Sequence, residues 1–446
     1  MQLLSRYSLL MALICIWATA IHRIASAAEL SLQVCLSTGD QTWTEQEQAI
    51  WRDLCAGRPA VFPHSSDTVP NVRAGFLSSI LDADHSKVIP TRKIIIDGAR
   101  TQEAINVVGL TVDKISFIGA VIRFIKFDNP QVGGFVVENS DITNIGFERG
   151  ELSDVAISKS SLGSASFASG SISSEITIAN NVKRLLFYEM HLGDVWLAGS
   201  PQIDDLRMFN STVDRTLGSA NALFTHIVIK DSQIKKDLDI SRARFVLDPT
   251  SIAEINIDNT AIERVGLPRI VPEKVTINGL SFSNWILDVI VTRNYMRLNS
   301  AYNPKLLDDI ASAYRKIGDY AGVREIQYFK ASKEYDHSAL VNRALMFISW
   351  MTVGYGLYPE IGFLWISALV ISGYFVFRTG KVSGHAAPRS WLVYSIDTIL
   401  PFIELDKKHK DINFSGWRQY FVYVMRMISV VVVYLLFRVL QNAIVT

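Results

Sequence analysis

The sequence predicts a mainly β fold: a β-helix preceded by a small N-terminal helical cap and followed by an α-helical C-terminal membrane domain. Three observations lead to this prediction. Residues 135–174 divide without a gap into eight five-residue words, two long apolar runs follow residue 360, and a short basic and apolar leader opens the chain. The net charge of +1 indicates no particular class of partner.

The β-helix is predicted by the words FVVEN SDITN IGFER GELSD VAISK SSLGS ASFAS GSISS. Their third letter is always a large aliphatic residue or Phe, as at Phe147, and their first letter alternates between an apolar and a very small residue. Inward positions therefore recur at steps of two and three, which neither a lone strand nor an α-helix produces. A chain that turns a corner every five residues does produce them. Its coils must stack, because none can bury its apolar row alone.

These words resemble those of pentapeptide-repeat proteins: a small residue, a polar one, a large apolar one and two polar ones. The resemblance implies a right-handed β-helix with four words in each square coil. Looser repeats extend the predicted shaft over residues 92–288, and slips of phase at Glu175 and at residues 216–221 predict a bulge or a corner loop. A β-sandwich of short strands is the alternative.

The N-terminus has the pattern of a secretory signal peptide, residues 1–27. Arg6 precedes an apolar run over residues 7–21, and Ala25-Ser26-Ala27 forms a cleavage site. Arg23, between the run and the site, departs from the pattern. We expect an exported protein, with the peptide either cleaved or retained as an anchor.

Residues 28–91 are predicted to form a small cap closed by a disulfide. Cys35 and Cys55 are the two cysteines beyond the signal peptide, and in an exported chain such a pair favours a disulfide worth roughly 3 kcal/mol. Between them Thr44-Glu45-Gln46-Glu47 offers a capping box for a helix. A redox pair is the alternative, although the spacing is not Cys-x-x-Cys.

Residues 289–345 are predicted to form a helical hairpin. Pro304 opens a helix over residues 305–317, and a Gly318-Asp319 turn leads to a second helix over residues 321–335. We interpret the hairpin as a cap that joins the shaft to the membrane. A partner-binding surface is the alternative.

Residues 346–446 are predicted to form a membrane domain with two spans. The runs over residues 361–377 and 420–445 are apolar, and Arg426 and Arg438 lie roughly 18 Å apart along a helix, far enough to reach opposite interfaces. Seven basic residues lie between the spans, at 378–419, and none follows Arg438. The positive-inside rule therefore places that loop in the cytoplasm and the shaft outside.

Two segments invite a comparison with pores. Residues 352–356 read Thr-Val-Gly-Tyr-Gly, the potassium-filter pentapeptide, but the mature chain has no preceding span, so a turn leading into the first span is favoured. The apolar stretch over residues 391–402 lies between the spans. We favour an interfacial amphipathic helix over a re-entrant pore loop.

No catalytic, cofactor-binding or metal-binding residue is predicted. Parallel β-helices that cleave acidic polysaccharides set carboxylates and basic residues in a row along the outer face. The densest such cluster is formed by Glu148, Arg149, Glu151 and Asp154, but solubility alone requires a polar outer face. Asp82-Ala83-Asp84-His85 is the one tight group that suits a metal, and it is weak evidence. A phosphate-binding glycine loop is absent from the sequence.

The order of repeats, hairpin, Gly-Tyr-Gly turn and two spans resembles bacterial membrane proteins that join pentapeptide repeats to a two-span domain. The resemblance implies little about activity. We expect a membrane-anchored periplasmic scaffold or interaction protein in the bacterial inner membrane, with lipid and another protein or an envelope polysaccharide as partners, and no nucleic acid. A channel-like membrane protein and a polysaccharide-active β-helix are the alternatives.

Overall fold

The computed structural model describes most of the chain in two compact units, residues 1–309 and 310–446. The described residues are 17, 19–20, 29–62, 71–246, 251–379, 382–383, 388, 390–400, 405, 409, 413–414 and 416–445. Nearly all of the predicted signal peptide, residues 1–27, lies outside them.

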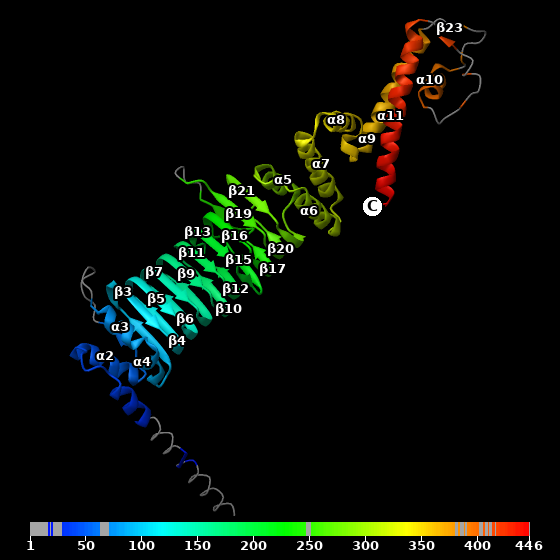
Figure 1. The fold of residues 1–446 in the computed structure, drawn as a ribbon. Coiled ribbons are helices and arrows are strands. Elements are labelled where there is room, and N and C mark those ends of the chain that lie inside the picture. Colours follow the sequence, from blue (N-terminus) through cyan, green and yellow to red (C-terminus); the bar gives the residue numbers. More distant parts are fainter. Residues whose placement is uncertain are drawn as a thin grey trace, which may run out of the picture. The chain divides into compact units, whose positions relative to one another are not determined.

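The first unit is a parallel β-solenoid of about nine turns, which confirms the predicted fold class (Figure 1). One sheet has the order β1 (Ala60–Val61), β2 (Lys93–Asp97), β4 (Thr111–Ile118), β6 (Gln131–Glu138), β8 (Glu151–Ser158), β10 (Ser171–Ile178), β12 (His191–Leu197), β14 (Thr212–Val213), β17 (Gln233–Asp239), β20 (Ala261–Gly266) and β22 (Ser281–Trp285). The other has the order β21 (Lys274–Asn278), β19 (Glu254–Asp258), β16 (Leu223–Lys230), β13 (Gln202–Phe209), β11 (Val182–Tyr188), β9 (Ser161–Ala168), β7 (Asp141–Glu148), β5 (Val121–Asp128) and β3 (Arg100–Val108). Two short strands, β15 (Thr216–Ser219) and β18 (Arg244–Phe245), pair beside these paths.

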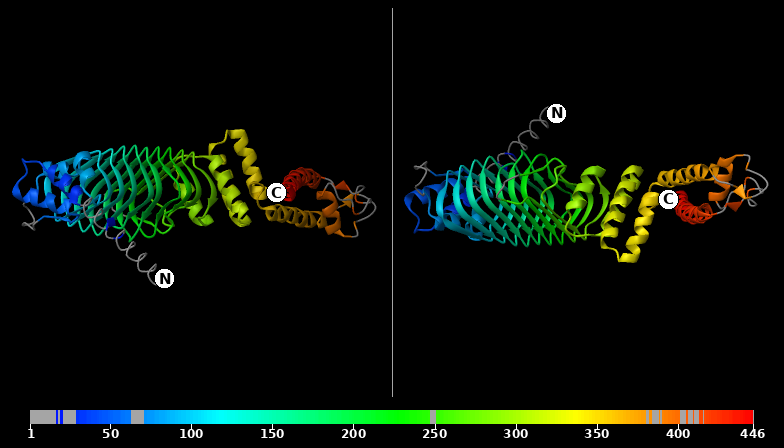
Figure 2. Two further views of the ribbon diagram at one scale, coloured as in Figure 1. Left: turned by 90° about the horizontal axis from the view of Figure 1, so that it is seen from below. Right: turned by 90° about the horizontal axis from the view of Figure 1, so that it is seen from above.

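Each regular coil takes 20 residues, as four five-residue words require. Ile142 pairs with Leu162 and Val132 pairs with Leu152 in parallel register. All eight third-letter residues of the repeat are buried, from Val137 to Ile172. The predicted inward rhythm of two and three is therefore confirmed, and the coils stack in register along the shaft (Figure 2).

Aromatic rings fill the shaft at equivalent positions of successive coils. Phe127, Phe147, Phe167 and Phe187 stack with ring centroids 5.0, 5.0 and 5.4 Å apart and nearly parallel planes. Phe135 meets Phe147 edge to face at 4.9 Å. Such contacts add roughly 0.5–1.5 kcal/mol per pair to the burial of the rings.

The phase slips of the sequence have two different outcomes. The register shifts between Ile172 and Glu175, which confirms the bulge predicted there. The loop predicted over residues 216–221 is wrong in part, because Thr216–Ser219 forms β15 and the break lies at residues 214–215. The sequence separation between paired residues is 21 for His191 and Thr212 but 22 for Val195 and Leu217. One extra residue is therefore accommodated between β14 and β15.

A small helical cap covers the first coil. Residues 29–37 are helical, and α2 (Glu45–Cys55), α3 (Ala74–Ile80) and α4 (Ala83–Val88) follow. The structure has the predicted capping box, in which the Thr44 hydroxyl accepts from the Glu47 N–H, and the predicted disulfide between Cys35 and Cys55. Strand β1 pairs with β2, so the first edge of that sheet is not left as a bare template for aggregation.

Helices follow the shaft. α5 (Val289–Leu298) precedes α6 (Pro304–Lys316) and α7 (Tyr320–His337), the last two matching the expected hairpin helices. The remaining elements are α8 (Leu340–Val353), the short 3₁₀ turn η1 (Gly354–Gly356), α9 (Pro359–Arg378), β23 (Val382–Ser383), α10 (Trp391–Ile399), β24 (Asn413–Phe414) and α11 (Trp417–Val445). The hairpin boundary expected at residue 345 falls within α8.

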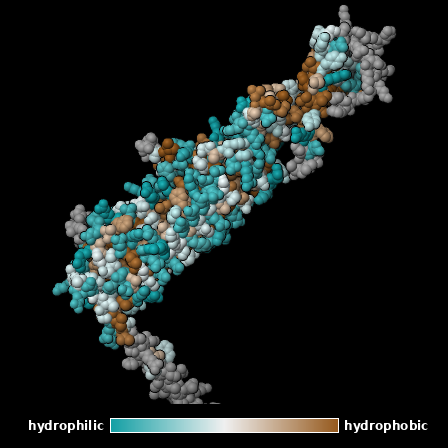
Figure 3. All heavy atoms as spheres, in the orientation of Figure 1, coloured by the Kyte–Doolittle hydropathy of each residue, from teal (hydrophilic) through white to brown (hydrophobic). Residues whose placement is uncertain are grey.

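Two of these helices, α9 and the first 22 residues of α11, are long and apolar enough to cross a membrane. At 1.5 Å per residue, 20 residues extend about 30 Å, the thickness of a bilayer core. Hydrophobic residues gather on the outside of α8, α9 and α11 (Figure 3). Two spans are therefore possible by length and composition.

Candidate binding surface of the solenoid

Two members of the charged cluster singled out in the sequence, Glu148 and Arg149, form ion pairs with the preceding coil. Arg149 Nη2 donates to Asp128 Oδ1 at 2.7 Å on the preceding coil, and Lys126 Nζ lies 2.9 Å from Glu148 Oε2. The hydrogen bond to Asp128 raises the pKa of Arg149. Glu151 and Asp154 are exposed. Ion pairing and exposure of this kind match a solvated outer face.

Similar ion pairs between neighbouring coils continue along the shaft. Charged partners about 20 to 27 residues apart meet in Lys159–Glu138, Arg215–Asp194, Lys235–Asp214, Arg264–Asp237 and Lys274–Glu254, with distances of 2.5 to 3.2 Å. The hydrogen bond from Lys235 lowers the pKa of Asp214. Exposed ion pairs of this kind contribute about 0–1 kcal/mol each to the free energy of unfolding, so we interpret them as contacts that order side chains on the outer face.

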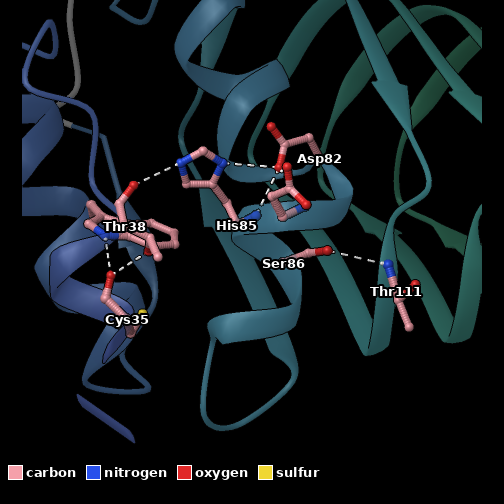
Figure 4. A network of polar contacts seen from close by, with 8 residues as sticks. Cys35, Thr38, Asp82, His85, Ser86 and Thr111 are labelled. Atoms are coloured by element: carbon pink, nitrogen blue, oxygen red, sulfur yellow. Dashed lines mark hydrogen bonds and ion pairs between the residues drawn. The ribbon is translucent and has the colours of Figure 1, made fainter. Parts of the chain in front are cut away.

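The Asp82–His85 segment forms a helix cap and not a metal site (Figure 4). Asp82 Oδ1 accepts from the backbone N–H groups of Asp84 and His85, and it lies 3.0 Å from His85 Nδ1. His85 Nε2 lies 3.1 Å from the carbonyl oxygen of Thr38, so both ring nitrogens have partners. Among the described residues no group of three metal-ligating side chains is present.

The cysteine pair is shielded. Cys35 and Cys55 are 0% and 2% exposed, and the carbonyl of Cys35 accepts a hydrogen bond from Trp51 Nε1 at 3.0 Å. A thiol that exchanges needs access to its partner. The burial favours a structural disulfide over a redox pair.

The Thr-Val-Gly-Tyr-Gly segment forms the turn between α8 and α9. Gly354, Tyr355 and Gly356 have φ values of 54°, 61° and 85°, a left-handed run that glycine tolerates well. The carbonyls of Gly354 and Val353 accept from the N–H groups of Leu357 and Tyr358 at 3.2 and 3.3 Å. Because these carbonyls close the turn, they do not form a row of free ligands as in a potassium filter.

The stretch expected to be an interfacial helix contains α10, which packs against α9. Ser395 Oγ donates to the carbonyl of Val370 at 2.7 Å. A Cβ on Gly373 would lie 2.3 Å from Ser395 Oγ, so close packing of the two helices requires glycine at position 373. At nine residues α10 is about 13 Å long, too short to cross a bilayer. Its place relative to lipid stays a prediction.

A buried contact between a histidine and a carboxyl group joins residue 409 to α10, and sequence reasoning missed it. His409 Nδ1 lies 2.6 Å from Asp397 Oδ2, and both side chains are 7% exposed. The His409 ring also meets Tyr394 edge to face. Asp397, the single acidic residue in the run over residues 391–402, was the available signal.

A basic pocket is the main feature that sequence reasoning missed. It is a hollow of about 570 Å³ beside the ends of β17, β20 and β22. Its lining includes Arg242, Arg244 and Arg269, which are exposed, together with the exposed Ile270 and Ile286. None of the three arginines has an ion-pair partner within the described part of the chain. The available signal was an Arg-Ala-Arg sequence where the repeat loses its phase.

Among the described residues that line the pocket, one carries a carboxylate. This residue is Asp288, but its Oδ1 accepts from the N–H of Val291 and caps α5. Elsewhere on the shaft, Arg149, Lys159 and Arg215 pair with carboxylates on the preceding coil. The pocket, which we call the arginine pocket, is therefore suited to an acidic group from outside the chain.

Comparison with family models, curated proteins and solved structures finds no protein similar to this chain.

Proposed function

We propose that the protein is a membrane-anchored scaffold whose solenoid binds an acidic partner protein at the arginine pocket. Two helices supply the anchor and a stiff, parallel shaft supplies the binding surface. The observation that carries the proposal is that three exposed arginines line one hollow and have no ion-pair partner among the described residues, whereas other basic residues of the shaft, such as Lys159, Arg215 and Lys235, pair with carboxylates.

A protein fits this pocket better than a simple ion. Protein interfaces are enriched in arginine and combine apolar contacts with a polar rim. Ile270 and Ile286 are more than half exposed beside the guanidinium groups, so apolar and acidic side chains would both find contacts there. An envelope polysaccharide would use the arginines but would gain less from the isoleucines.

The location is part of the same proposal. The leader over residues 1–27, and the seven basic residues at 378–419, favour a solenoid in the periplasm and a loop in the cytoplasm. We therefore place the protein in a bacterial inner membrane as a two-span protein.

The binding proposal is tested by photo-crosslinking in native membranes. A photoreactive amino acid replaces Ile270, and adducts are compared with those of the same protein carrying Arg242→Glu and Arg244→Glu. We expect discrete protein adducts that the charge reversals abolish. Lys159→Glu is the matched control, because it reverses a charge that is already paired within the shaft, and it should leave the adducts intact.

Two results would contradict the proposal. Adducts that survive the double charge reversal would show that the arginines do not bind the partner. Adducts that resist protease and yield to glycan-cleaving treatment would identify the ligand as a polysaccharide instead.

A further inference from the structure

Helix α8 combines an apolar composition with extensive exposure of its large side chains. Seven of its large apolar side chains are between 40% and 84% exposed: Leu340, Val341, Leu345, Phe347, Ile348, Trp350 and Met351. Arg343 is its single charged residue, and it has no acidic side chain. Only Thr352 and Val353 at its end are buried. A helix with this much bare apolar surface is unfavourable in water and needs a cover.

The neighbours of α8 indicate what the cover is. Within the second unit α8 lies beside both possible spans, α9 and α11. Trp365 Nε1 of α9 donates to the carbonyl of Met351 at 2.8 Å, which satisfies a carbonyl in the last turn of α8. The apolar surface of α8 is thus continuous with that of α9, where Leu364 and Ile371 are also exposed.

The geometry of the joint keeps α8 from extending α9. Gly354 has a φ of 54°, and a Cβ added to it would lie 2.8 Å from Tyr358 Cδ2. Trp350 Nε1 donates to the Tyr328 hydroxyl at 2.8 Å, which ties α8 to the polar helix α7. α8 therefore lies beside the charged helix α7 and a possible span.

We propose that α8 lies in the interface of the bilayer, with its apolar side chains in the acyl boundary and Arg343 near the headgroups. At 14 residues α8 is about 21 Å long, too short to span the bilayer but suited to lie along its surface. Tryptophan at position 350, with its N–H bonded and its ring exposed, is a typical interface residue. This inference rests on the proposed function, because it takes α9 as a span.

The test uses lipid-borne quenchers and the full chain in phosphatidylcholine–phosphatidylglycerol vesicles. A fluorophore is attached to Leu345→Cys in α8, to Ile371→Cys in α9 and to Ile317→Cys at the end of α6, in a chain that also carries Cys15→Ser. All three positions are exposed and apolar, so they are matched except in their expected environment. We expect a quencher near the headgroup to quench residue 345 most, a deep quencher to quench residue 371 most, and residue 317 to be quenched by neither.

Each other outcome overturns the inference. If residue 345 behaves like residue 317 while residue 371 is quenched, α8 lies in water or against protein, and the anchor still stands. If the deep quencher acts most strongly on residue 345, α8 lies within the bilayer core. If neither 345 nor 371 is quenched, the membrane anchor fails together with the inference.

Discussion

Phe147 and Arg149 lie two positions apart and face opposite environments. Phe147 is 3% exposed between the rings of Phe127 and Phe167, whereas Arg149 lies on the outside with a φ of 57°. The five-residue word assigns these roles, because its third letter faces inward and its fifth faces water. A change of chemistry at each position should therefore have very different effects.

We predict that Phe147→Asp prevents the shaft from folding, while Arg149→Asp changes stability little. The first change buries an unpaired carboxylate and removes a stacked ring, at a cost of at least about 4 kcal/mol. The second loses an exposed ion pair, and Asp tolerates a left-handed backbone. Protease resistance of the two purified variants checks this. Equal loss of resistance would show that the inward phase is wrongly assigned.

Tyr295 gives a prediction about pH. It is fully buried, its hydroxyl donates to the carbonyl of Pro268 at 2.9 Å, and burial raises its pKa above the ordinary value of 10.0. The folded protein therefore keeps the phenol protonated, so its contribution is fully present below about pH 10 and is lost as the pH rises further.

Tyr295→Phe should thus lower the unfolding free energy by about 1–2 kcal/mol at pH 8, because the Pro268 carbonyl loses its donor. The difference between the two proteins should shrink above pH 10. Urea unfolding of the full chain in detergent at both pH values measures it. A difference that does not change with pH would contradict a buried, protonated Tyr295.

The turns explain how the coil is built at the scale of elements. A left-handed residue recurs every ten residues at Asn129, Asn139, Arg149, Lys159 and Ser169, each with φ between 49° and 57°. Where one coil contacts the next, the residue that follows the left-handed residue has a small side chain. At two of these positions, Ser140 and Ser160, each hydroxyl accepts the N–H of the equivalent residue one coil earlier, so the buried backbone is satisfied along the shaft.

Glycine is required at one turn position by close packing. A Cβ at Gly170 would lie 2.3 Å from the carbonyl oxygen of Gly150 on the preceding coil, whereas a Cβ at Gly75, in α3, meets nothing within 4 Å. We predict that Gly170→Ala destabilises the shaft by about 1–3 kcal/mol and that Gly75→Ala stabilises the cap by about 0.5–1 kcal/mol. Thermal unfolding of both variants checks this, and an unchanged transition for Gly170→Ala would refute the close coil contact.

Much of the solenoid was predictable because its periodicity is local. The words from Phe135 onwards determine the inward phase, and Glu175 shows its bulge as an interruption of that phase. Residues 214–219 were not predictable in detail, since a single added residue can be absorbed on either side of a short strand. The handedness stays a prediction from the resemblance.

The candidate sites were much less predictable, because they depend on distant residues. Arg149 belongs to the densest charged cluster in the sequence, but its partner, Asp128, comes from the preceding coil. The arginine pocket joins corners of three different coils, around residues 242, 269 and 286. The partners of His409 and His85 likewise come from separate segments. No local pattern encodes such contacts.

At the scale of the whole molecule, the chain joins a β-solenoid to two helices that can cross a bilayer. The shaft has a repetitive outer face with ion pairs between neighbouring coils and a basic pocket among its last coils. A shaft of this kind can present a binding surface, and the apolar helices can hold the shaft at a membrane. The scaffold proposal requires that shaft and inter-helix loop lie on opposite sides of that membrane.

Thiol labelling of intact and permeabilised cells tests this requirement most directly. Asn221→Cys lies on the shaft and Ser390→Cys lies between α9 and α11, each in a chain that carries Cys15→Ser, and Cys35 and Cys55 are held in a disulfide. With the outer membrane opened, we predict that a membrane-impermeant maleimide labels residue 221 at once and residue 390 only after the inner membrane is permeabilised. Labelling of residue 390 in sealed cells, or protection of residue 221, would contradict the anchored periplasmic scaffold.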